Sequence, residues 1–567
     1  MAKATVDKRI GAGIATAAVL IMLGNAASRL LGLGREQVIA ALFGQTGATD
    51  AFVAANTVPT MLYDLVVAGA VSAALIPVFS GYVGQREEDL RRVAGTILTL
   101  TTIVLALAVA VLWLFADQVM AVLGGGFAPG DRALAIHLVH LALPAVIFLG
   151  LSGVVTAILY ARQVFVYSAF CAATYNAGMI AMALLLAPRF GVASLAAGVL
   201  IGAILQLAVQ TPGLRGLGLR PALDLRHPGV QRILLLYAPV AIGLVVSQVG
   251  VAIDRNLASQ AGEGAMAAMR FATTLVQLPL GLIVTATSYA VLPSLSRFAA
   301  VSEPERPASA ATTPAPSGMT AAYTLAGDGA ALAAPPADDG QGEGAEAYRR
   351  TLSLGIRFSL FFILPAMIGL VALREPLVAL VFQHGVFAAA DTARTAWILL
   401  FYLPQLPFVA VDQLLIFAFY ARKNTLTPML VGVLGVGIYL VAGLNLLGPM
   451  QAAGLALANT LQHTVHATVL FVLLSREVGG LADRGLGSSL ARLALAAAVT
   501  GLALYLLGPI LAAMADLASF WGQLTYLLAA TAVGGAVYLA AAAALRCEEI
   551  SLAVGLLRRL ANRGTAA

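Results

Sequence analysis

The chain has 567 residues, of which 60% are hydrophobic and only 11% are charged, and its mean hydropathy is +0.91. A water-soluble protein of this length could not hide so much apolar surface with so few charges outside, so lipid is the expected solvent. The formal net charge of +6 would suggest nucleic acid as a partner of a soluble domain. In a membrane protein the distribution of charge matters more than its sum, and we expect no nucleic-acid partner.

The chain begins with the basic stretch MAKATVDKRI and turns apolar at once. No small-residue cleavage site ends a short apolar core, so we interpret this stretch as a lead into the first helix rather than a removable signal. A span needs about 17 to 25 mostly apolar residues, and on that rule the sequence predicts about fourteen transmembrane helices. Their approximate ranges are 12–42, 51–80, 94–123, 133–161, 165–187, 190–212, 230–256, 265–296, 351–373, 390–420, 425–447, 450–474, 488–514 and 519–546.

Lysine and arginine residues alternate with these spans. One set of alternate loops, together with both chain ends, holds 24 of the 33 basic residues, whereas the opposite loops hold little more than Arg132, Arg189 and Arg374. Short loops rich in lysine and arginine stay in the cytoplasm. The sequence therefore predicts that both termini are cytoplasmic.

The segment from about 299 to 348 interrupts the apolar pattern. It is rich in Ala, Pro, Gly and Asp and has no apolar period. Such a composition is typical of a disordered linker, and we interpret it as a cytoplasmic tether between two halves of the protein.

The two halves are related by an internal duplication. Residues 125–162 align without a gap onto a segment 260 positions later, and both segments keep a proline in step and carry the triplet Tyr-Ala-Arg, at 160–162 and 420–422. A second pair, AVSAALIPVFS at 70–80 and ATSYAVLPSLS at 286–296, lies 216 apart. Each pair places one helix on the sixth helix after it, so the two lobes should share one orientation in the membrane.

The predicted fold class is thus an all-α polytopic membrane protein with two parallel-repeat six-helix lobes and two C-terminal helices. The expected domains are an N-lobe at 1–230, a C-lobe at 231–475 that contains the linker 299–348, and the last two helices with a tail at 476–567.

Charged side chains inside a span are costly and usually face a cavity or a partner. Arg29 and Arg35 lie in the first predicted span, within GNAASRLLGLGREQ, where the glycines would let the helix bend or open towards an anion. We expect Arg29 to face a cavity. For Arg35, snorkelling or an ion pair with Glu36 is the alternative.

Several acidic residues also lie at membrane depth. Asp50 opens the second span and could be an N-cap, whereas Asp64 lies deep within it and is expected to face a wet cavity or pair with an arginine. Asp254 is the preferred candidate for binding a coupling ion, because a carboxylate at depth can carry a proton or coordinate a cation; an ion pair with Arg255 is the alternative. Asp412 is buried in the tenth span.

Two HxxH pairs, His137/His140 and His463/His466, occur on predicted helices. Two ligands do not make a metal site, so we interpret both pairs as polar contacts between helices and expect no metal. The phosphate-binding pattern GxxxxGK[ST] is absent, which argues against ATP as the direct energy source. Two parallel lobes without a catalytic constellation favour a rocking transporter with a central cavity over an enzyme.

An ordered series of motifs spans almost the whole chain. It consists of SRLLGLGRE at 28–36, ATDAF at 48–52, AGAVSAALIPVFS at 68–80, QLPLG at 277–281, LPSLSR at 292–297, FQHGVF at 382–387 and FYARKNTLTP at 419–428. In this order the motifs resemble those of the MviN/MurJ family of lipid II flippases, within the multidrug/oligosaccharidyl-lipid/polysaccharide exporter superfamily.

The resemblance implies an alternating-access flippase that moves an undecaprenyl-pyrophosphate-linked peptidoglycan precursor, lipid II, across the cytoplasmic membrane through a cavity lined by basic residues. By motif position it implies functional roles for Arg29, Arg35 and Asp50. The chain departs from the family by carrying Tyr63 and Asp64, and Thr274, where the family usually carries arginines. Arg270, one helical turn before Thr274, could replace the second of these. The predicted substrate-binding set is Arg29, Arg35, Asp50, Asp64 and Arg270.

We further expect no cofactor, with an ion gradient or the membrane potential as the energy source. The expected partners are the lipid-linked precursor, membrane lipids and other cell-wall synthesis proteins, and the protein is expected to be a monomer in the bacterial inner membrane. The alternative is a related exporter of another lipid-linked oligosaccharide or of an amphiphilic drug. A drug exporter should have an acidic cavity, so Arg29 and Arg35 argue against it, whereas Asp64 and Asp412 temper that argument. A non-transporting scaffold would not need buried charges.

Overall fold

In a computed structural model of the chain, every regular element among the described residues is a helix. The structure describes residues 2–65, 74–84, 86–284, 291, 294–298, 341–481 and 485–551. A backbone in lipid must satisfy its N–H and C=O groups within its own segment, which explains why long apolar runs form helices. The predicted linker lies outside the described residues as far as position 340. Its last eight residues are helical, because α15 begins at Gln341.

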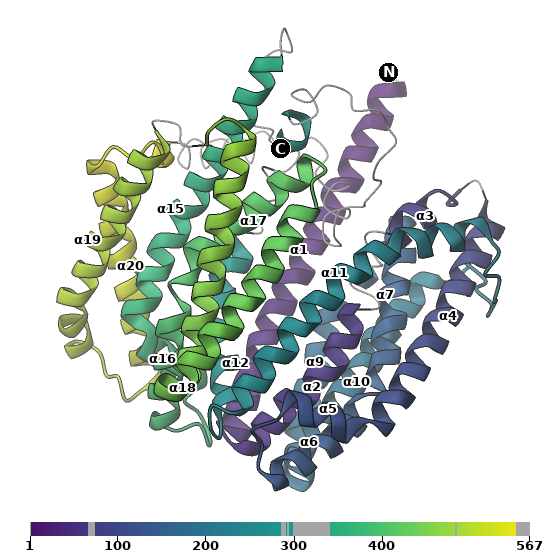
Figure 1. Cartoon of the computed structure of the whole chain (residues 1–567), viewed down its shortest axis with the longest axis horizontal. Coiled ribbons are helices and arrows are strands. Elements are labelled where there is room, and N and C mark those ends of the chain that lie inside the picture. Colours follow the sequence, from purple (N-terminus) through teal and green to yellow (C-terminus); the bar gives the residue numbers. More distant parts are fainter. Residues whose placement is uncertain are drawn as a thin grey trace. The chain divides into compact units, whose positions relative to one another are not determined.

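The helices form two compact units. Among the described residues the first unit holds 2–65, 74–84, 86–267 and 384–387. Its elements are α1 (Ala2–Phe43), α2 (Gly47–Tyr63), α3 (Ile76–Ser80), α4 (Glu87–Leu114), α5 (Ala116–Leu123), α6 (Pro129–Ala142), α7 (Ala145–Ala161), α8 (Val166–Ala169), α9 (Cys171–Phe190), α10 (Ala193–Gln210), the 3-10 turn η3 (Thr211–Leu214) and α11 (Pro228–Ser259). In this unit α7 packs against α4 and α10, and α10 packs against α9 (Figure 1).

The second unit begins within α12 (Ala265–Pro279), after Ala267. It continues with the π-helical turn η4 (Leu280–Val284), α15 (Gln341–Phe382), α16 (Ala389–Tyr402), α17 (Gln405–Ala421), α18 (Leu426–Glu477), α19 (Leu486–Ala513) and α20 (Phe520–Ala544). Helix α15 packs against α17, α19 and α20, and α18 packs against α16 and α17 (Figure 1). The two C-terminal helices are therefore part of the second unit. The compact units part after Ala267, and α11 belongs to the first of them; the lobe bounds drawn from the sequence repeat stay a prediction.

Seven of the described helices are long and apolar enough to cross a membrane, and up to ten spans result if each bent helix pair is one span. Two of these pairs, α6–α7 and α16–α17, bend by 41° and 45°. Each bend lies at a proline, Pro144 or Pro404, which has no N–H to donate to the preceding turn. The chain is thus an all-helical multi-span membrane protein, and the count of fourteen remains a prediction.

The backbone repeats itself at the offset found in the sequence. Helices α16 and α17 begin and end 260 positions after α6 and α7. The residue after each Tyr-Ala-Arg triplet has a positive φ, 60° at Gln163 and 57° at Lys423. Gly191 (φ 54°, ψ −136°) and Gln451 (φ 50°, ψ −131°) share a second unusual conformation at the same offset, and Gln451 breaks α18 into two helical segments. The structure therefore confirms the duplication over these helices.

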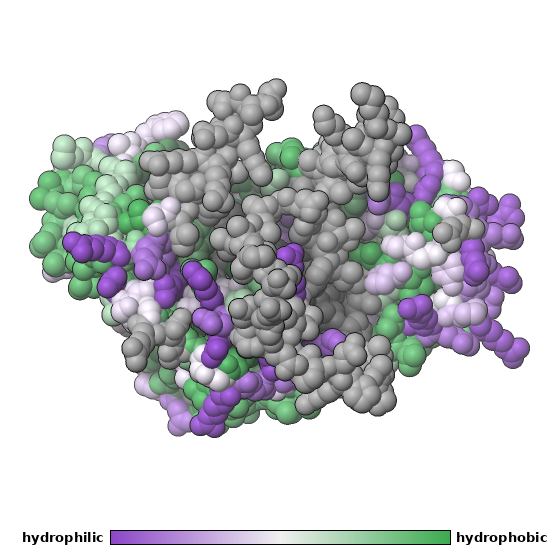
Figure 2. Space-filling model, turned by 90° about the horizontal axis from the view of Figure 1, so that it is seen from above, coloured by the Kyte–Doolittle hydropathy of each residue, from purple (hydrophilic) through white to green (hydrophobic). Residues whose placement is uncertain are grey.

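Apolar side chains cover much of the outer surface, as lipid requires. In Figure 2 hydrophobic atoms gather at the edge formed by α19 and α20, where Tyr505 is 78% exposed and Trp521 is 73% exposed. Inside the second unit, the buried Tyr348 and Tyr538 each donate a hydrogen bond of 2.8 Å to a carbonyl of a neighbouring helix, at Ala418 and Phe361. These two buried tyrosine hydroxyl groups are thus satisfied.

Candidate functional site

Arg35 lies in the middle of a polar network between α1 and α9. Its Nε and one Nη donate to Glu36 Oε1 at 3.1 and 2.6 Å, and the other Nη donates to Asn176 Oδ1 at 2.9 Å. The Asn176 amide in turn donates to the Ser28 carbonyl at 3.1 Å. The ion pair with Glu36, one of the two interpretations left open by the sequence, is thus present. The network holds the guanidinium in one orientation, and two of its five N–H donors have no partner among the described residues.

Arg29 lies about 1.7 turns before Arg35 on the same helix, and it is exposed. The glycines around it do not open the helix, because α1 is continuous from Ala2 to Phe43. At Gly24 the lack of a side chain serves packing instead: a Cβ there would collide with the Ala169 carbonyl of α8. The predicted opening of α1 towards an anion is therefore not the conformation in this structure.

Asp50 caps a helix other than its own. The N-cap of α2 is Thr46, whose hydroxyl accepts the Thr49 amide at 3.3 Å. Asp50 is 3% exposed, and its Oδ1 accepts the Ala267 amide in the first turn of α12 at 2.8 Å. A carboxylate at a helix N-terminus satisfies a free amide and interacts favourably with the helix dipole.

A second contact of the same kind runs the opposite way. Glu263, just before α12, accepts the amide of Gly47 in the first turn of α2 at 3.1 Å. Each of the two helices thus has its first turn capped by a carboxylate from the other segment. This reciprocal capping joins the first turn of α2 to the first turn of α12 within the first unit.

Arg270 lies one turn after Ala267 and is partly buried. The hydroxyl groups of Thr273 and Thr274 both donate to its carbonyl, at 3.0 and 2.9 Å. Residues four apart project from the same face of a helix, so Arg270 and Thr274 share one face of α12. This is the geometry that a replacement of the family arginine by Arg270 requires.

The remaining predicted acidic residues have different surroundings. The backbone N–H of Asp64 caps the end of α2, and no described residue hydrogen-bonds or pairs with its carboxylate. Asp254 lies on α11, 3.4 Å from the guanidinium of Arg255. This ion pair is the alternative that the sequence left open, and a coupling role for Asp254 stays a prediction.

The FQHGVF motif of the second half contributes a short segment to the first unit. The amide of Val386 donates to the Ala41 carbonyl near the end of α1 at 3.0 Å. Gly385 has a φ of 61°, and a Cβ there would meet the Ala41 backbone, so only glycine fits at this position. The motif therefore positions the end of α1, the helix with both predicted arginines.

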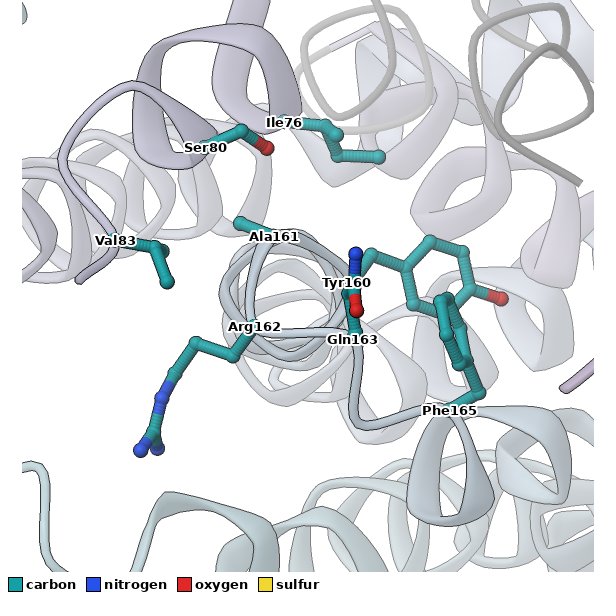
Figure 3. A pocket seen from close by; sticks show the side chains of 8 residues that line it. All are labelled: Ile76, Ser80, Val83, Tyr160, Ala161, Arg162, Gln163 and Phe165. Carbon is teal, nitrogen blue, oxygen red and sulfur yellow. The ribbon is translucent and has the colours of Figure 1, made fainter. Parts of the chain in front are cut away.

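A cavity of about 480 Å³ lies in the first unit at the end of α7. Figure 3 shows its lining residues, Ile76, Ser80, Val83, Tyr160, Ala161, Arg162, Gln163 and Phe165. None of the predicted substrate-binding residues lines it. Arg162 belongs to the first Tyr-Ala-Arg triplet, and no described residue forms an ion pair with it; its counterpart Arg422 pairs with Glu477 at 3.7 Å.

One polar pair was not predicted as a pair. His466 on α18 lies 2.6 Å from Asp412 on α17, measured from Nδ1 to Oδ1. The sequence analysis marked Asp412 as buried and His466 as part of an HxxH, but no sequence signal joins the two residues, which lie 54 positions apart. Among the described residues, no three His, Cys, Asp or Glu side chains gather in a way that could hold a metal ion. In the first HxxH, His140 stacks on Trp113 with ring centroids 4.7 Å apart.

Comparison with known sequences identifies one family. The sequence profile described as "Lipid II flippase MurJ" matches residues 39–325 and 330–524. A "Probable lipid II flippase MurJ" of Vibrio cholerae is 29% identical over 514 residues, covering 88% of this chain and 89% of the relative. The "Lipid II flippase MurJ" of Burkholderia cenocepacia is 28% identical over 467 residues, covering 79% of this chain and 81% of that one.

Solved structures show the same fold. "Lipid II flippase MurJ, inward closed conformation" superposes with a TM-score of 0.73 at 20% identity, covering 94% of this chain and all of the other. A multidrug resistance MATE family transporter of the MOP superfamily, in an inward-facing conformation, has a TM-score of 0.62 at 14% identity and covers 80% of this chain. At these identities the likeness concerns the fold.

Proposed function

The chain belongs to the lipid II flippase MurJ family, and from this premise we propose that it moves an undecaprenyl-pyrophosphate-linked peptidoglycan precursor across the bacterial cytoplasmic membrane by alternating access. The observation that carries the proposal is the family match, which covers most of the chain in two long segments. Relatives that are flippases by name align over four-fifths or more of their own length, which supports the same function for this chain.

The diphosphate of such a substrate needs cationic partners in a solvated cavity, while its lipid tail stays in the bilayer. Arg29 is exposed and Arg35 keeps two N–H donors for an anion while Glu36 and Asn176 hold it in place. We assign the pyrophosphate to these two side chains and to Arg270. Asp50 acts indirectly, because its contact with Ala267 positions the helix that carries Arg270. Asp64 stays in the proposed set as a polar group for the rest of the headgroup.

The remaining parts of the proposal follow from the same role. Because the proposed function moves the substrate across the membrane without changing it chemically, the protein is a transporter rather than an enzyme. Its energy source is an ion gradient or the membrane potential, and it needs no cofactor. Both termini are cytoplasmic, as the basic loops indicate, and its partners are the precursor, membrane lipids and other proteins of wall synthesis, with the flippase itself a monomer.

Complementation tests the proposal. When the flippase of a tractable bacterium is depleted, expression of this chain should restore growth and wall synthesis. Arg29→Ala and Arg35→Ala should each abolish the rescue at normal expression. The lysine variants should restore part of it, because lysine keeps the charge but loses the bidentate fork.

Arg92→Ala is a matched control, since Arg92 pairs with Asp224 at 3.1 Å on an exposed face of the same unit. It should rescue as well as the wild type. If the wild type fails while its expression and membrane insertion are normal, the substrate assignment is wrong. Rescue by the chain with all three of Arg29, Arg35 and Arg270 changed to alanine would refute the basic-cavity mechanism and favour the alternative exporter.

A further inference from the structure

The duplication places one hydrogen bond at the same position in both units. In the first unit the Gln206 amide on α10 donates to the Ser152 hydroxyl on α7 at 3.0 Å. Adding the offset of 260 to these positions gives Asp412 on α17 and His466 on α18, which lie 2.6 Å apart. Both units therefore form a hydrogen bond at this helix contact. The contact does not require a charge, because the first unit makes it with neutral groups.

The second pair is buried in the helical core of its unit. The side chains of Asp412 and His466 are 10% and 12% exposed. Glycines on the first segment of α18 leave room for the imidazole: a Cβ at Gly435 would lie 3.7 Å from the ring. No Lys or Arg of the described residues pairs with Asp412. Among the described residues, the imidazole of His466 is therefore the group that can neutralise the negative charge of the Asp412 carboxylate.

Other titratable groups lie near the pair on the surrounding helices. On α18, His463 lies one turn before His466 and interacts electrostatically with both members of the pair. On α17, Tyr420 interacts with Asp412. Helix α15 presents Tyr348, whose hydroxyl donates a hydrogen bond to the Ala418 carbonyl. The sequence of η4, LGLIV, is entirely apolar. The pair and His463 thus form a small titratable cluster in otherwise apolar surroundings.

A carboxylate and an imidazole at this distance can hold one or two protons. With one proton, Nδ1–H of a neutral imidazole donates to the carboxylate, and the pair has a charge of −1. A second proton binds at Nε2, giving an imidazolium beside a carboxylate and a net charge of zero. Charges are costly at membrane depth, and histidine changes its protonation within the physiological pH range. Ser152 and Gln206 have no such second state.

We propose that Asp412 and His466 form a proton-binding site through which transport is coupled to the proton gradient, an inference that rests on the proposed transport function. The proton is taken from water on one side of the membrane and released to water on the other, so nothing is consumed. Helix α17 adjoins the bend of 45° at Pro404, and α18 is broken at Gln451. A change of charge at the contact between them therefore acts on two helices that already bend.

The duplication supplies the variant for the test. The double change Asp412→Ser with His466→Gln installs the neutral pair of the first unit, which the same helix packing already accommodates. Purified full-length protein is reconstituted in liposomes with a labelled lipid-linked precursor, and transport is measured with and without a pH gradient at a clamped membrane potential. The wild type should be faster with the gradient, and the double variant should lose this stimulation.

The first-unit change Ser152→Ala with Gln206→Ala is the control, and it should keep the stimulation; Asp254→Asn tests the rival coupling residue. Stimulation retained in the double variant, absent from the wild type, or lost only in Asp254→Asn would overturn the proposal. If neither the wild type nor any variant moves the precursor, the proposed function is wrong. The proton site is then tested by a second measurement, which does not depend on transport. In a pH titration in detergent, the wild type should bind about one proton more than the double variant between about pH 5 and 8. An equal uptake would refute the site independently of transport.

Discussion

Replacement of Asp50 by alanine tests whether this buried carboxylate caps α12. The change removes the acceptor of the Ala267 amide, which lies 2.8 Å away with the carboxylate 3% exposed. A hydrogen bond to a charged group contributes about 1.5–3 kcal/mol, and loss of an N-cap costs about 0.5–2 kcal/mol. We therefore expect Asp50→Ala to lower the free energy of unfolding by about 2 kcal/mol, a change of roughly 30-fold in the ratio of folded to unfolded protein.

Asp50→Asn should lie between the wild type and the alanine variant, because the amide oxygen still accepts the N–H but has no charge. The assay is thermal unfolding of the purified protein in detergent, with complementation measured on the same variants. Asp391→Ala is the matched control. Asp391 accepts the Ala388 amide of its own helix at 2.9 Å in an exposed position, where the loss should be about 0.5 kcal/mol. Equal stabilities of Asp50→Ala and Asp391→Ala would refute the capping role.

Three further predictions concern other positions. Arg270→Ala should be inactive in complementation, and adding Thr274→Arg should rescue it, because both residues project from one face of α12; full activity of Arg270→Ala would mean that other groups hold the anion. Gly385→Ala should lower the thermal unfolding midpoint, because its φ of 61° and the nearby Ala41 backbone disfavour a side chain, and an unchanged midpoint would show that the segment packs differently. Single cysteines should react with an impermeant thiol reagent from outside at some positions only, and external labelling at 320 would overturn the predicted orientation. The positions expected to react are 128 and 450, and those expected not to react are 88, 220 and 320.

Much of the fold could be predicted from the sequence. The apolar runs predicted helices, and the prolines at 144 and 404 lie at bends of the same kind in both units. The offset of 260 extends even to the unusual backbone at Gly191 and Gln451. These features are local, so the sequence specifies them directly.

The site contacts were harder to predict because they join residues distant in sequence. Asn176 holds Arg35 across 141 positions, and the Ala267 amide meets Asp50 across 217. Helices in lipid are apolar on most faces, so their periodicity does not show which faces touch. Asp50 was identified as a candidate cap, but the helix that it caps could not be derived from its neighbours in the chain.

We propose that arginines on α1 let the chain expose a lipid-linked pyrophosphate precursor at the outer face of the membrane. The most direct measurement is the fraction of this precursor in living, flippase-depleted cells that an externally added enzyme can cleave at the pyrophosphate. Expression of the wild type should restore cleavage, Arg92→Ala should do the same, and Arg29→Ala and Arg35→Ala should leave the precursor protected. Precursor that stays protected in cells expressing the wild type, or is cleaved equally with all four proteins, would contradict the account.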